Sequence, residues 1–479
     1  MGKMKVLLVS SESFPFAGTG GLAYVCRSLA QELQRLGNEV TLIMPLYREV
    51  MEGGWMLHPF SSGLRVELGR EALEAEVYKG ELRGGIEVLF VRRDEYFDRS
   101  HLYGTSRGDY FDNAQRFTFF SKAVVALGEA LGWPWEVVHC HDWQTALVPV
   151  YLWLRREKVR CGTVFTIHNL GYQGIFPPDA FALTGLPGEL FCPEGLEFWG
   201  KLNLLKGGIY FSSVITTVSP TYAREIQTPE FGFGLDGVLR ACAHKLVGIL
   251  NGVDYETWSP EGDPHIAAHY SREDLGGKRE CKNELIELND LSPSLMGAPL
   301  FGMISRLVSQ KGIDILIPVL RRLLVKGAGV VILGEGEERY EEELQRLAQG
   351  FSGRMSVVIA FDESLSHKVL AGCDIYLMPS RYEPCGLAQM RALRYGTVPV
   401  VRHTGGLADT VTDLKGERGT GFSFHLYRSA YLWRATRRAL RHFARRGSWR
   451  AMMRRGMKCD FSWRKAAEAY LQVYERAKG

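Results

Sequence analysis

Short apolar runs typical of buried β-strands alternate with helix-like stretches along most of the 479-residue chain. Residues 4–10 form such a run, and residues 23–36 follow as an amphipathic stretch that ends at Gly37. This alternation predicts an α/β fold with parallel sheets, in which ligands bind at the carboxyl ends of the strands. The predicted strands are residues 4–10, 39–44, 137–140, 163–167, 214–218, 245–249, 300–304, 330–333, 355–359, 375–378 and 398–401, and the clearest predicted helices are 23–36, 338–348, 366–371 and 466–478.

The alternating pattern is interrupted between residues 249 and 300. A turn at 251–254 and a loop at 258–264 precede a charged, helical stretch near 272–289, and a new strand–helix series starts at Leu300. Domain boundaries fall in such irregular segments. We therefore expect two domains, with the boundary near Gly248.

One five-residue sequence occurs twice, as Thr19-Gly-Gly-Leu-Ala23 and as Thr404-Gly-Gly-Leu-Ala408. Each copy follows a strand-like run and precedes a helix-like one. Glycines at such a turn let backbone N–H groups approach a ligand, and a helix N-terminus favours negative charge. The pair therefore suggests two nucleotide-binding-type halves facing one cleft. The alternative is that both are tight turns needed only for packing.

The charge, apolar content and cysteines of the chain indicate which partners and which compartment to expect. The net charge of +4 is too small to indicate a nucleic-acid partner, although residues 428–465 carry 13 Lys and Arg against one acid. That segment is either a phosphate- or membrane-seeking helix or a packed helix with a solvated basic face. We find no apolar window long enough to span a membrane, and the N-terminus does not resemble a signal peptide. The nine dispersed cysteines are typical of reduced thiols in the cytoplasm.

Two segments of the second half place charged residues after predicted strands. Arg306 and Lys311 lie in Ser305-Arg-Leu-Val-Ser-Gln-Lys-Gly312, where two cations suit a diphosphate. Glu383 lies in Met378-Pro-Ser-Arg-Tyr-Glu-Pro-Cys-Gly-Leu387, before a predicted helix start, where a carboxylate could hold sugar hydroxyls while amides hold phosphate. The alternatives are two surface cations and an N-capping glutamate.

In the first half, polar residues follow two predicted strands. His139, His141 and Asp142 end one, and His168 ends the next. Their spacing does not support a metal site, because no second fixed pair of ligands is present. Asp142 and His168 are the better candidates for an active site, whereas a lone loop histidine is usually structural.

With these segments in view, the chain resembles the bacterial glycogen synthase and plant starch synthase family over nearly its whole length. The resemblance implies a GT-B fold, with two Rossmann-like domains facing an interdomain cleft: residues 1–247, residues 248–455, and a helix in 456–479 that returns to the first domain. It implies retaining transfer of glucose from ADP-glucose to the non-reducing end of an α-1,4-glucan (glycogen), with no metal or other cofactor. The segments that carry it are SSESFPFAGTGGLA, DNAQRFTFFSKA, VVHCHDWQTALVP, TIHNLGYQGIF, TVSPTYAREIQTPEFGFGLDGVL, GILNGVDYETWSP, SRLVSQKGID, LMPSRYEPCGL and ALRYGTVPVVRHTGGLADTV.

The resemblance also implies roles for individual residues. Arg306 and Lys311 would stabilise the diphosphate, Glu383 would hold glucose hydroxyls, His168 would lie near the anomeric carbon, and Asp142 would position donor or acceptor. Tyr172 and Gln173 would shape the acceptor side. The donor-binding set would comprise Gly18, Gly20, Gly21, Asn251, Cys385, Gly386, Leu387, Thr404, Gly405 and Gly406.

The first glycine loop departs from the family pattern, which reads Lys-x-Gly-Gly-Leu-Ala-Asp. Gly18 stands in place of the lysine and Tyr24 in place of the aspartate. The lysine is assigned to the donor phosphate, so Gly18→Lys would restore a charge-assisted contact. Three interpretations follow: a synthase that uses its remaining cations, an enzyme with a changed donor such as UDP-glucose or a small-sugar acceptor, or a weakly active glucan-binding paralogue. A phosphorylase would need a pyridoxal-phosphate lysine context that we do not find. The sequence predicts neither a nucleic-acid partner nor membrane insertion, and it does not define the oligomeric state.

Overall fold

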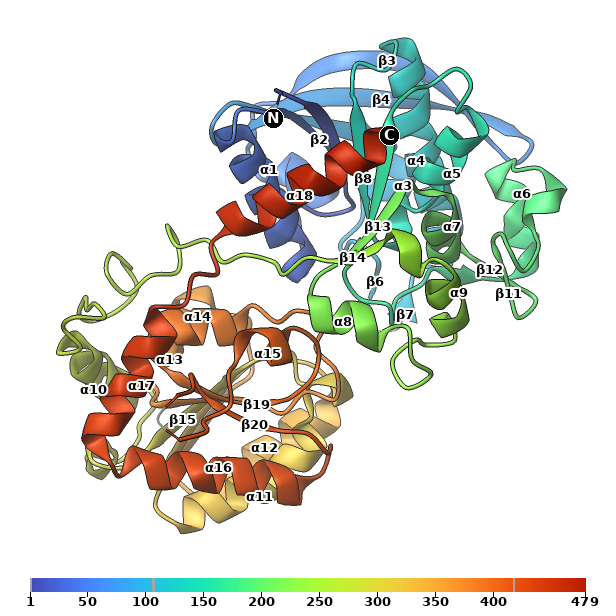
Figure 1. The fold of residues 1–479 in the computed structure, drawn as a ribbon. Coiled ribbons are helices and arrows are strands. Elements are labelled where there is room, and N and C mark those ends of the chain that lie inside the picture. Colours follow the sequence, from blue (N-terminus) through green and yellow to red (C-terminus); the bar gives the residue numbers. More distant parts are fainter. Residues whose placement is uncertain (1, 106–107, 417) are drawn as a thin grey trace. The chain divides into compact units, whose positions relative to one another are not determined.

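A computed structural model describes residues 2–105, 108–416 and 418–479, and it divides the chain into two compact units (Figure 1). Unit 1 comprises Met1–Asn251 and Trp463–Gly479, and unit 2 comprises Gly252–Ser462. The chain therefore leaves unit 1 after Asn251, where the sequence suggested 247, and rejoins it at Trp463, where the sequence suggested 456. Both units are α/β with parallel sheets, so the predicted fold class is confirmed.

Unit 1 is built on a nine-stranded sheet whose strands β14 to β5 run parallel, while β4 and β3 extend one edge in antiparallel fashion. The central strands are buried on both faces; every residue of β8 is buried, for example. In sheet order the strands are β14 (Leu246–Gly248), β13 (Val214–Thr217), β9 (Gly162–Ile167), β8 (Val137–His141), β1 (Lys5–Val9), β2 (Glu39–Pro45), β5 (Ile86–Arg92), β4 (Glu71–Leu82) and β3 (His58–Leu68).

Helices cover this sheet, and short strands lie at its margins. These strands are β6 (Gly104–Thr105) and β7 (Gly108–Asp109), and a small sheet of β10 (Ile175–Phe176), β12 (Lys201–Asn203) and β11 (Glu197–Phe198). The helices are α1 (Gly21–Arg35), α2 (Arg48–Glu52), α3 (Asp94–Phe97), α4 (Asn113–Ala130), α5 (Leu147–Leu154), α6 (Phe181–Thr184), α7 (Leu204–Phe211), α8 (Pro220–Glu225), α9 (Asp236–Ala241) and α18 (Trp463–Lys478).

The last helix belongs to unit 1 although the whole of unit 2 precedes it in the chain. Helix α18, red in Figure 1, packs against α1 and against β8, β9 and β13. Its Tyr470 and Tyr474 are fully buried, and the Tyr474 hydroxyl lies 2.9 Å from His139 Nδ1. Large aromatic side chains buried in this way anchor the C-terminal segment to the sheet.

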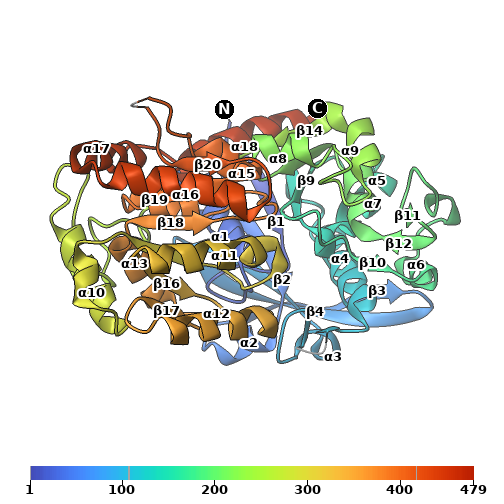
Figure 2. The ribbon, with the colours of Figure 1, turned by 90° about the horizontal axis from the view of Figure 1, so that it is seen from below.

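Unit 2 contains a six-stranded, all-parallel sheet with helices on its faces (Figure 2). Its strand order is β17 (Met355–Val358), β16 (Gly329–Leu333), β15 (Leu300–Ile304), β18 (Ile375–Met378), β19 (Val398–Arg402) and β20 (Phe422–Phe424). The helices are α10 (Gly277–Leu288), α11 (Ile313–Val325), α12 (Glu338–Gly350), α13 (Glu363–Gly372), α14 (Ala388–Arg394), α15 (Gly405–Thr410), α16 (Ser429–Phe443) and α17 (Arg446–Met457).

The basic segment 428–465 forms mainly α16 and α17 of unit 2. Leu432, Phe443 and Trp449 are buried in the unit 2 core, whereas Arg434 and Arg441 are exposed. Apolar residues at helical spacing with cations on the other side are typical of a surface helix. The packed-helix interpretation is therefore favoured over a helix that seeks phosphate or membrane. No helix among the residues that the structure describes is both long and apolar enough to cross a lipid bilayer.

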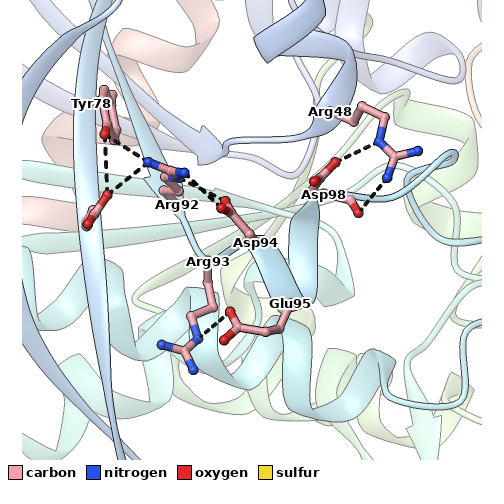
Figure 3. Close-up of polar contacts among 8 residues, drawn as sticks. Arg48, Tyr78, Arg92, Arg93, Asp94, Glu95 and Asp98 are labelled. Atoms are coloured by element: carbon pink, nitrogen blue, oxygen red, sulfur yellow. Dashed lines mark hydrogen bonds and ion pairs between the residues drawn. The ribbon is translucent and has the colours of Figure 1, made fainter.

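Surface ion pairs hold the turn around α3 (Figure 3). Arg92 contacts Asp94 at 2.8 Å and Glu76 at 3.3 Å, and Arg48 contacts Asp98 at 2.7 Å. These side chains are substantially exposed, so each pair contributes only about 0–1 kcal/mol. The cluster stabilises a surface turn locally and shows no sign of a site.

Candidate functional site

The strongest candidate site lies at the carboxyl edge of the unit 2 sheet, where the loops after β15 and β18 meet. Glu383 is only 5% exposed, and its two carboxylate oxygens accept hydrogen bonds from Lys311 Nζ at 2.9 and 2.7 Å. Ser380 Oγ donates a third, at 2.9 Å. The two charged residues that the sequence singled out separately therefore form one ion pair. Lys311 is therefore not an isolated surface cation. Glu383 is not an N-capping residue of α14, because its side chain accepts from Lys311 and Ser380.

Close backbone approach brings these two loops together. Gly312 has φ +76°, and a Cβ there would lie 2.2 Å from the Pro379 carbonyl oxygen. The Arg381 N–H donates to the Gln310 carbonyl at 2.8 Å. Only glycine permits this contact, and the contact sets the position of Lys311 next to Glu383.

Arg306 differs from Lys311 in its surroundings. It follows β15, is exposed, and has no side-chain hydrogen bond or ion pair with any residue that the structure describes. An exposed guanidinium at the carboxyl edge of a parallel sheet is available to an anionic ligand, because it need not give up a partner within residues 2–105, 108–416 or 418–479. Phe361 follows β17 at the same edge and is 77% exposed; sequence reasoning missed this ring, which could stack on a flat heterocycle.

The second Gly-Gly pair is required by packing against the Glu383 loop. A Cβ at Gly405 would lie 1.9 Å from the Glu383 carbonyl oxygen, and one at Gly406 would lie 2.0 Å from that of Cys385. The Gly406 N–H donates to the Glu383 carbonyl at 3.1 Å. The Gly406 amide is therefore already bonded within the protein, and packing requires glycine at both positions of this copy. The place of Gly405 and Gly406 in the donor-binding set stays a prediction. Thr404 is buried in the turn that precedes the pair.

The turn after Glu383 is also tightly held. Cys385 is buried, Gly386 has φ +72°, and Leu387 precedes the first residue of α14. Gln389 Nε2 donates to the carbonyls of Cys385 and Gly386 at 3.0 and 2.8 Å. This network leaves the backbone of the turn with little freedom.

The first Gly-Gly pair is in a different environment. A Cβ at Gly20 or Gly21 would meet nothing within 4 Å, so packing does not require glycine at either position. Glu12, which sequence reasoning missed, is 3% exposed and accepts from the Thr19 N–H at 2.7 Å and from Thr19 Oγ1 at 2.9 Å. Among the described residues, no side-chain hydrogen bond caps the N-terminus of the 15-residue helix α1. Such an N-terminus favours an anion.

Gly18 is sterically restricted. A Cβ there would lie 2.4 Å from Ala23 Cβ and 3.2 Å from the Phe14 ring, and Phe14 packs against Tyr24 with ring centroids 4.4 Å apart. In the loop that departs from the family pattern, Phe14 and Ala23 therefore leave no room for a side chain at position 18.

We therefore expect Gly18→Lys to destabilise the protein by about 1–3 kcal/mol through overpacking and not to raise turnover. Thermal unfolding and steady-state rates measure the two effects. Gly21→Ala, placed in open space, is the matched control for stability and should leave the melting temperature nearly unchanged. A faster and equally stable Gly18→Lys protein would contradict this account of the loop.

In unit 1, the carboxyl ends of β8 and β9 bring His141, Asp142 and His168 together. His141 Nδ1 lies 3.0 Å from His168 Nε2, and Asp142 Oδ1 accepts from the His168 N–H at 2.7 Å. Asp142 has φ +57°, an unusual conformation for a residue other than glycine and one often found at functional sites. Its carboxylate positions the turn that carries His168.

Burial shifts the pKa values of this cluster. Desolvation raises the pKa of the Asp142 carboxyl to about 7, and it lowers the pKa of His168 to about 3. It also lowers the pKa values of His139 and His141 well below the ordinary range. His168 is therefore neutral near pH 7 and can accept or donate one hydrogen bond without carrying charge.

These shifts predict acid sensitivity of unit 1. Each of the three histidines is neutral when folded and takes up a proton on unfolding, so its stabilisation is present above about pH 6.5 and lost as the pH falls; Asp142 acts in the opposite direction between about pH 4 and 7. With a net uptake of about two protons, the free energy of unfolding should fall by roughly 2–3 kcal/mol per pH unit below pH 6. Urea unfolding at pH 7.5 and 5.0 measures this, and a smaller slope is expected for His141→Phe. Equal stability at both values would rule out buried neutral histidines.

The remaining predicted residues are less directly placed for ligand contact. His139 bonds to Tyr474 and Thr166, so its role is structural. Gln173 is buried and donates to the Phe233 carbonyl, whereas Tyr172 is 53% exposed. Asn251 ends the first segment of unit 1, and its buried Oδ1 has no partner among the described residues. Within the same residues, no group of three or more His, Cys, Asp or Glu could hold a metal ion.

The chain has two Rossmann-like units. Arg306, Lys311 and Glu383 lie at the carboxyl edge of the unit 2 sheet, and His168 lies at the carboxyl edge of the unit 1 sheet. This combination is typical of a glycosyltransferase of the GT-B class. The chain is similar over 100% of its length to the catalytic domain of starch synthase IV from Arabidopsis thaliana bound to ADP and acarbose, with a TM-score of 0.91, 32% identity and complete coverage of that chain. A sucrose-phosphate synthase from Thermosynechococcus elongatus, 16% identical with a TM-score of 0.62, shares the fold.

Comparison with sequence families gives the finer assignment. Residues 5–241 match the starch synthase catalytic domain, and residues 292–450 match the glycosyl transferases group 1 family. Glycogen synthase 2 of Geobacter sulfurreducens is 46% identical, with 99% of both chains covered, and the glycogen synthase of Thermodesulfovibrio yellowstonii is 42% identical, with 98% of this chain and 97% of that protein covered. The chain belongs to the glycogen and starch synthase family. It is a glucosyltransferase of the glycogen synthase type, and the sequence-based assignment is confirmed.

Proposed function

We propose that this glucosyltransferase transfers glucose from ADP-glucose to the non-reducing end of an α-1,4-glucan such as glycogen, with retention of configuration and release of ADP. The observation that carries the proposal is the part-buried Glu383–Lys311 ion pair, together with exposed Arg306, which follows β15 as Lys311 does and has no side-chain partner among the described residues. This group combines a carboxylate for sugar hydroxyls with two cations for a diphosphate. The description of the Arabidopsis relative as bound to ADP favours the adenine nucleotide over UDP.

Each residue has a distinct task in this proposal. Breaking the bond between glucose and phosphate develops negative charge on ADP, which Arg306 and Lys311 would stabilise. Glu383 would accept hydrogen bonds from glucose hydroxyls, and its contact with Lys311 fixes the position of the carboxylate. Phe361 would stack on the nucleobase.

The unit 1 cluster would act on the glucose and the acceptor. His168 would contribute a neutral imidazole or its backbone carbonyl near the anomeric carbon, because its lowered pKa leaves it without charge. Asp142 would be a positioning residue, since its carboxylate accepts the His168 N–H. The N-terminus of α1, with Gly20 and Gly21, would add amide donors for phosphate.

The loss of a lysine at position 18 has a calculable consequence. A charge-assisted hydrogen bond contributes about 1.5–3 kcal/mol, which corresponds to roughly 10- to 150-fold in binding or rate. A loss of that size slows an enzyme without abolishing its chemistry. The same departure motivates the second candidate, a synthase that uses UDP-glucose.

Initial rates with ADP-glucose and with UDP-glucose, each with and without glycogen, test the donor. We expect glycogen-dependent release of ADP that is faster than release of UDP and unchanged by EDTA, because no metal or other cofactor is part of the proposal. Faster release of UDP would establish the second candidate. Loss of activity in EDTA that Mg²⁺ restores would contradict the metal-independent mechanism. The proposed setting is the cytoplasm, consistent with nine cysteines that are all free.

A further inference from the structure

The outer face of helix α16 in unit 2 carries a row of arginines. Arg434, Arg437 and Arg441 recur every three or four residues and are all exposed, on the side of the helix opposite the residues that pack in the core. Residues at this spacing lie one above another on a helix, and seven residues span about 10 Å. We call these three residues the arginine stripe.

The arginine stripe is not neutralised within the part of the chain that the structure describes, where none of its three side chains has an ion pair. Arg438, next to the stripe, is different, because it donates to both carboxylate oxygens of Asp413 at 3.0 Å. Like charges three or four residues apart on a helix repel each other. An anionic partner would therefore stabilise the stripe.

The same layer of helices contains an acidic counterpart. Helices α12 and α16 both pack against α11, and Figure 2 shows the three together on unit 2. Residues 335–343, at the start of α12, contain six glutamates and one arginine. Glu338 and Glu342 lie one turn apart and are both exposed. We call these two residues the acidic turn.

The two charged surfaces are separated by α11, so one face of unit 2 is positive along α16 and negative along α12. A second copy, rotated by 180° about an axis that runs along α11 in the plane of contact, brings its α12 onto the α16 of the first copy. The same rotation brings its α16 onto the α12 of the first. Such a two-fold contact uses one patch of surface twice, and it requires that patch to be complementary to itself. The face formed by α12, α11 and α16 meets this requirement in charge.

We propose that two copies of this chain associate through the α12–α11–α16 face, with the arginine stripe of each copy against the acidic turn of the other. Arginine suits this role because its planar fork can bind a carboxylate through two hydrogen bonds. The inference goes beyond the proposed function and does not depend on it.

The surface chemistry of the face favours a protein partner over a membrane. Among the described residues of α12 and α16, no large apolar side chain is exposed, so the face lacks the anchors of a membrane-surface helix. On α11, Val325 is 76% exposed and supplies an apolar contact near the middle.

The size of the face predicts a weak dimer. Three helices of about 20 Å in length and about 10 Å in width present roughly 600 Å² per copy. About 1,200 Å² in total is at the lower limit for a specific interface. We therefore expect association that is reversible and sensitive to salt.

Sedimentation velocity of the whole protein over a range of concentrations tests the proposal. We expect a dimer with a dissociation constant of about 1–50 μM at about 50 mM NaCl. The constant should rise about 10-fold or more at about 500 mM NaCl, because salt screens exposed charges.

Charge reversal identifies the surfaces in contact. Arg437→Glu combined with Arg441→Glu should weaken the dimer about 20-fold or more, and so should Glu338→Lys combined with Glu342→Lys, because like charges then face each other. A mixture of the two double variants should form a dimer again, since opposite charges then meet in both contacts.

The control is Lys158→Glu combined with Arg160→Glu, which makes the same change in net charge at exposed positions of unit 1. It should dimerise as wild type does. Melting temperatures close to wild type would show that none of these exposed substitutions disturbs the fold.

Three results would overturn the proposal. The first is a monomer up to about 100 μM at low salt, including one that instead binds a nucleic-acid probe through Arg437 and Arg441. The second is a dimer that neither α12 nor α16 variant weakens, or that the unit 1 control weakens equally. The third is a mixture of the two double variants that stays monomeric. Glucose transfer enters none of these measurements, so an inactive protein that dimerises in this way would refute only the proposed function.

Discussion

Glu383→Ala should lower kcat by about 100- to 1,000-fold while changing the dissociation constant for ADP by less than about threefold. The carboxylate is assigned to the glucose hydroxyls, so its removal affects the sugar in the transition state and leaves the diphosphate contacts intact. Lys311 would lose its carboxylate partner and remain free to bind phosphate. Rates under saturating ADP-glucose and calorimetric titration with ADP measure the two quantities.

Glu383→Gln is the matched control for this result, because it keeps the size of the side chain and can still accept the Ser380 hydroxyl. It should retain more stability than alanine, since removing one member of a buried ion pair costs about 3–5 kcal/mol. Melting temperatures of both variants separate lost chemistry from lost folding. Equal losses in kcat and ADP affinity, in a folded protein, would show that Glu383 does not act on the sugar.

Arg306→Ala should weaken ADP binding, which Glu383→Ala should leave nearly unchanged. The Arg306 guanidinium is exposed and has no partner in the part of the chain that the structure describes, so its removal should change stability by less than about 0.5 kcal/mol. It should lower kcat/KM by about 100-fold or more and also weaken ADP binding, because a charge-assisted contact to the diphosphate is lost. Thermal unfolding, rates and ADP titration test the three expectations together.

Two variants, Arg306→Lys and Arg321→Ala, serve as controls. Arg306→Lys keeps the charge without the planar fork and should recover part of the lost ADP affinity. Arg321→Ala, on the exposed side of α11, should behave as wild type. If Arg306→Ala keeps the wild-type affinity for ADP, residues other than Arg306 bind the diphosphate. The proposed donor site would then lose its main support.

The parts of the fold that the sequence predicts best are the doubly buried strands. β15 and β18 have the predicted bounds, because an uninterrupted apolar run has few other interpretations. Strands β3 and β4 were missed. In β3, buried Leu64, Val66 and Leu68 alternate with exposed polar residues, and the strand forms one edge of the sheet. Alternation interrupted by glycine and proline is a weaker signal than a continuous run.

The candidate site shows a different limit. The sequence identified Lys311 and Glu383 individually, but their pairing across 72 residues depends on how close Gly312 comes to Pro379. The two Thr-Gly-Gly-Leu-Ala copies are identical in sequence, yet Gly21 lies in open space and Gly405 touches the Glu383 backbone. The packing around a glycine determines its structural role, and a five-residue sequence does not specify that packing. Glu12 was missed for the same reason, because its partners Thr19 and Tyr103 are brought to it by the fold.

The most direct test of the proposed reaction is analysis of the glucan product. Purified protein is incubated with ADP-glucose and maltoheptaose, the chains are measured by mass spectrometry, and they are then digested with an exoglucosidase specific for α-1,4 linkages. We predict chains lengthened by whole glucose units, one ADP released for each unit added, and complete digestion of the added units. Free glucose without chain extension, or added units that resist the α-specific enzyme, would contradict retaining transfer to an α-1,4-glucan.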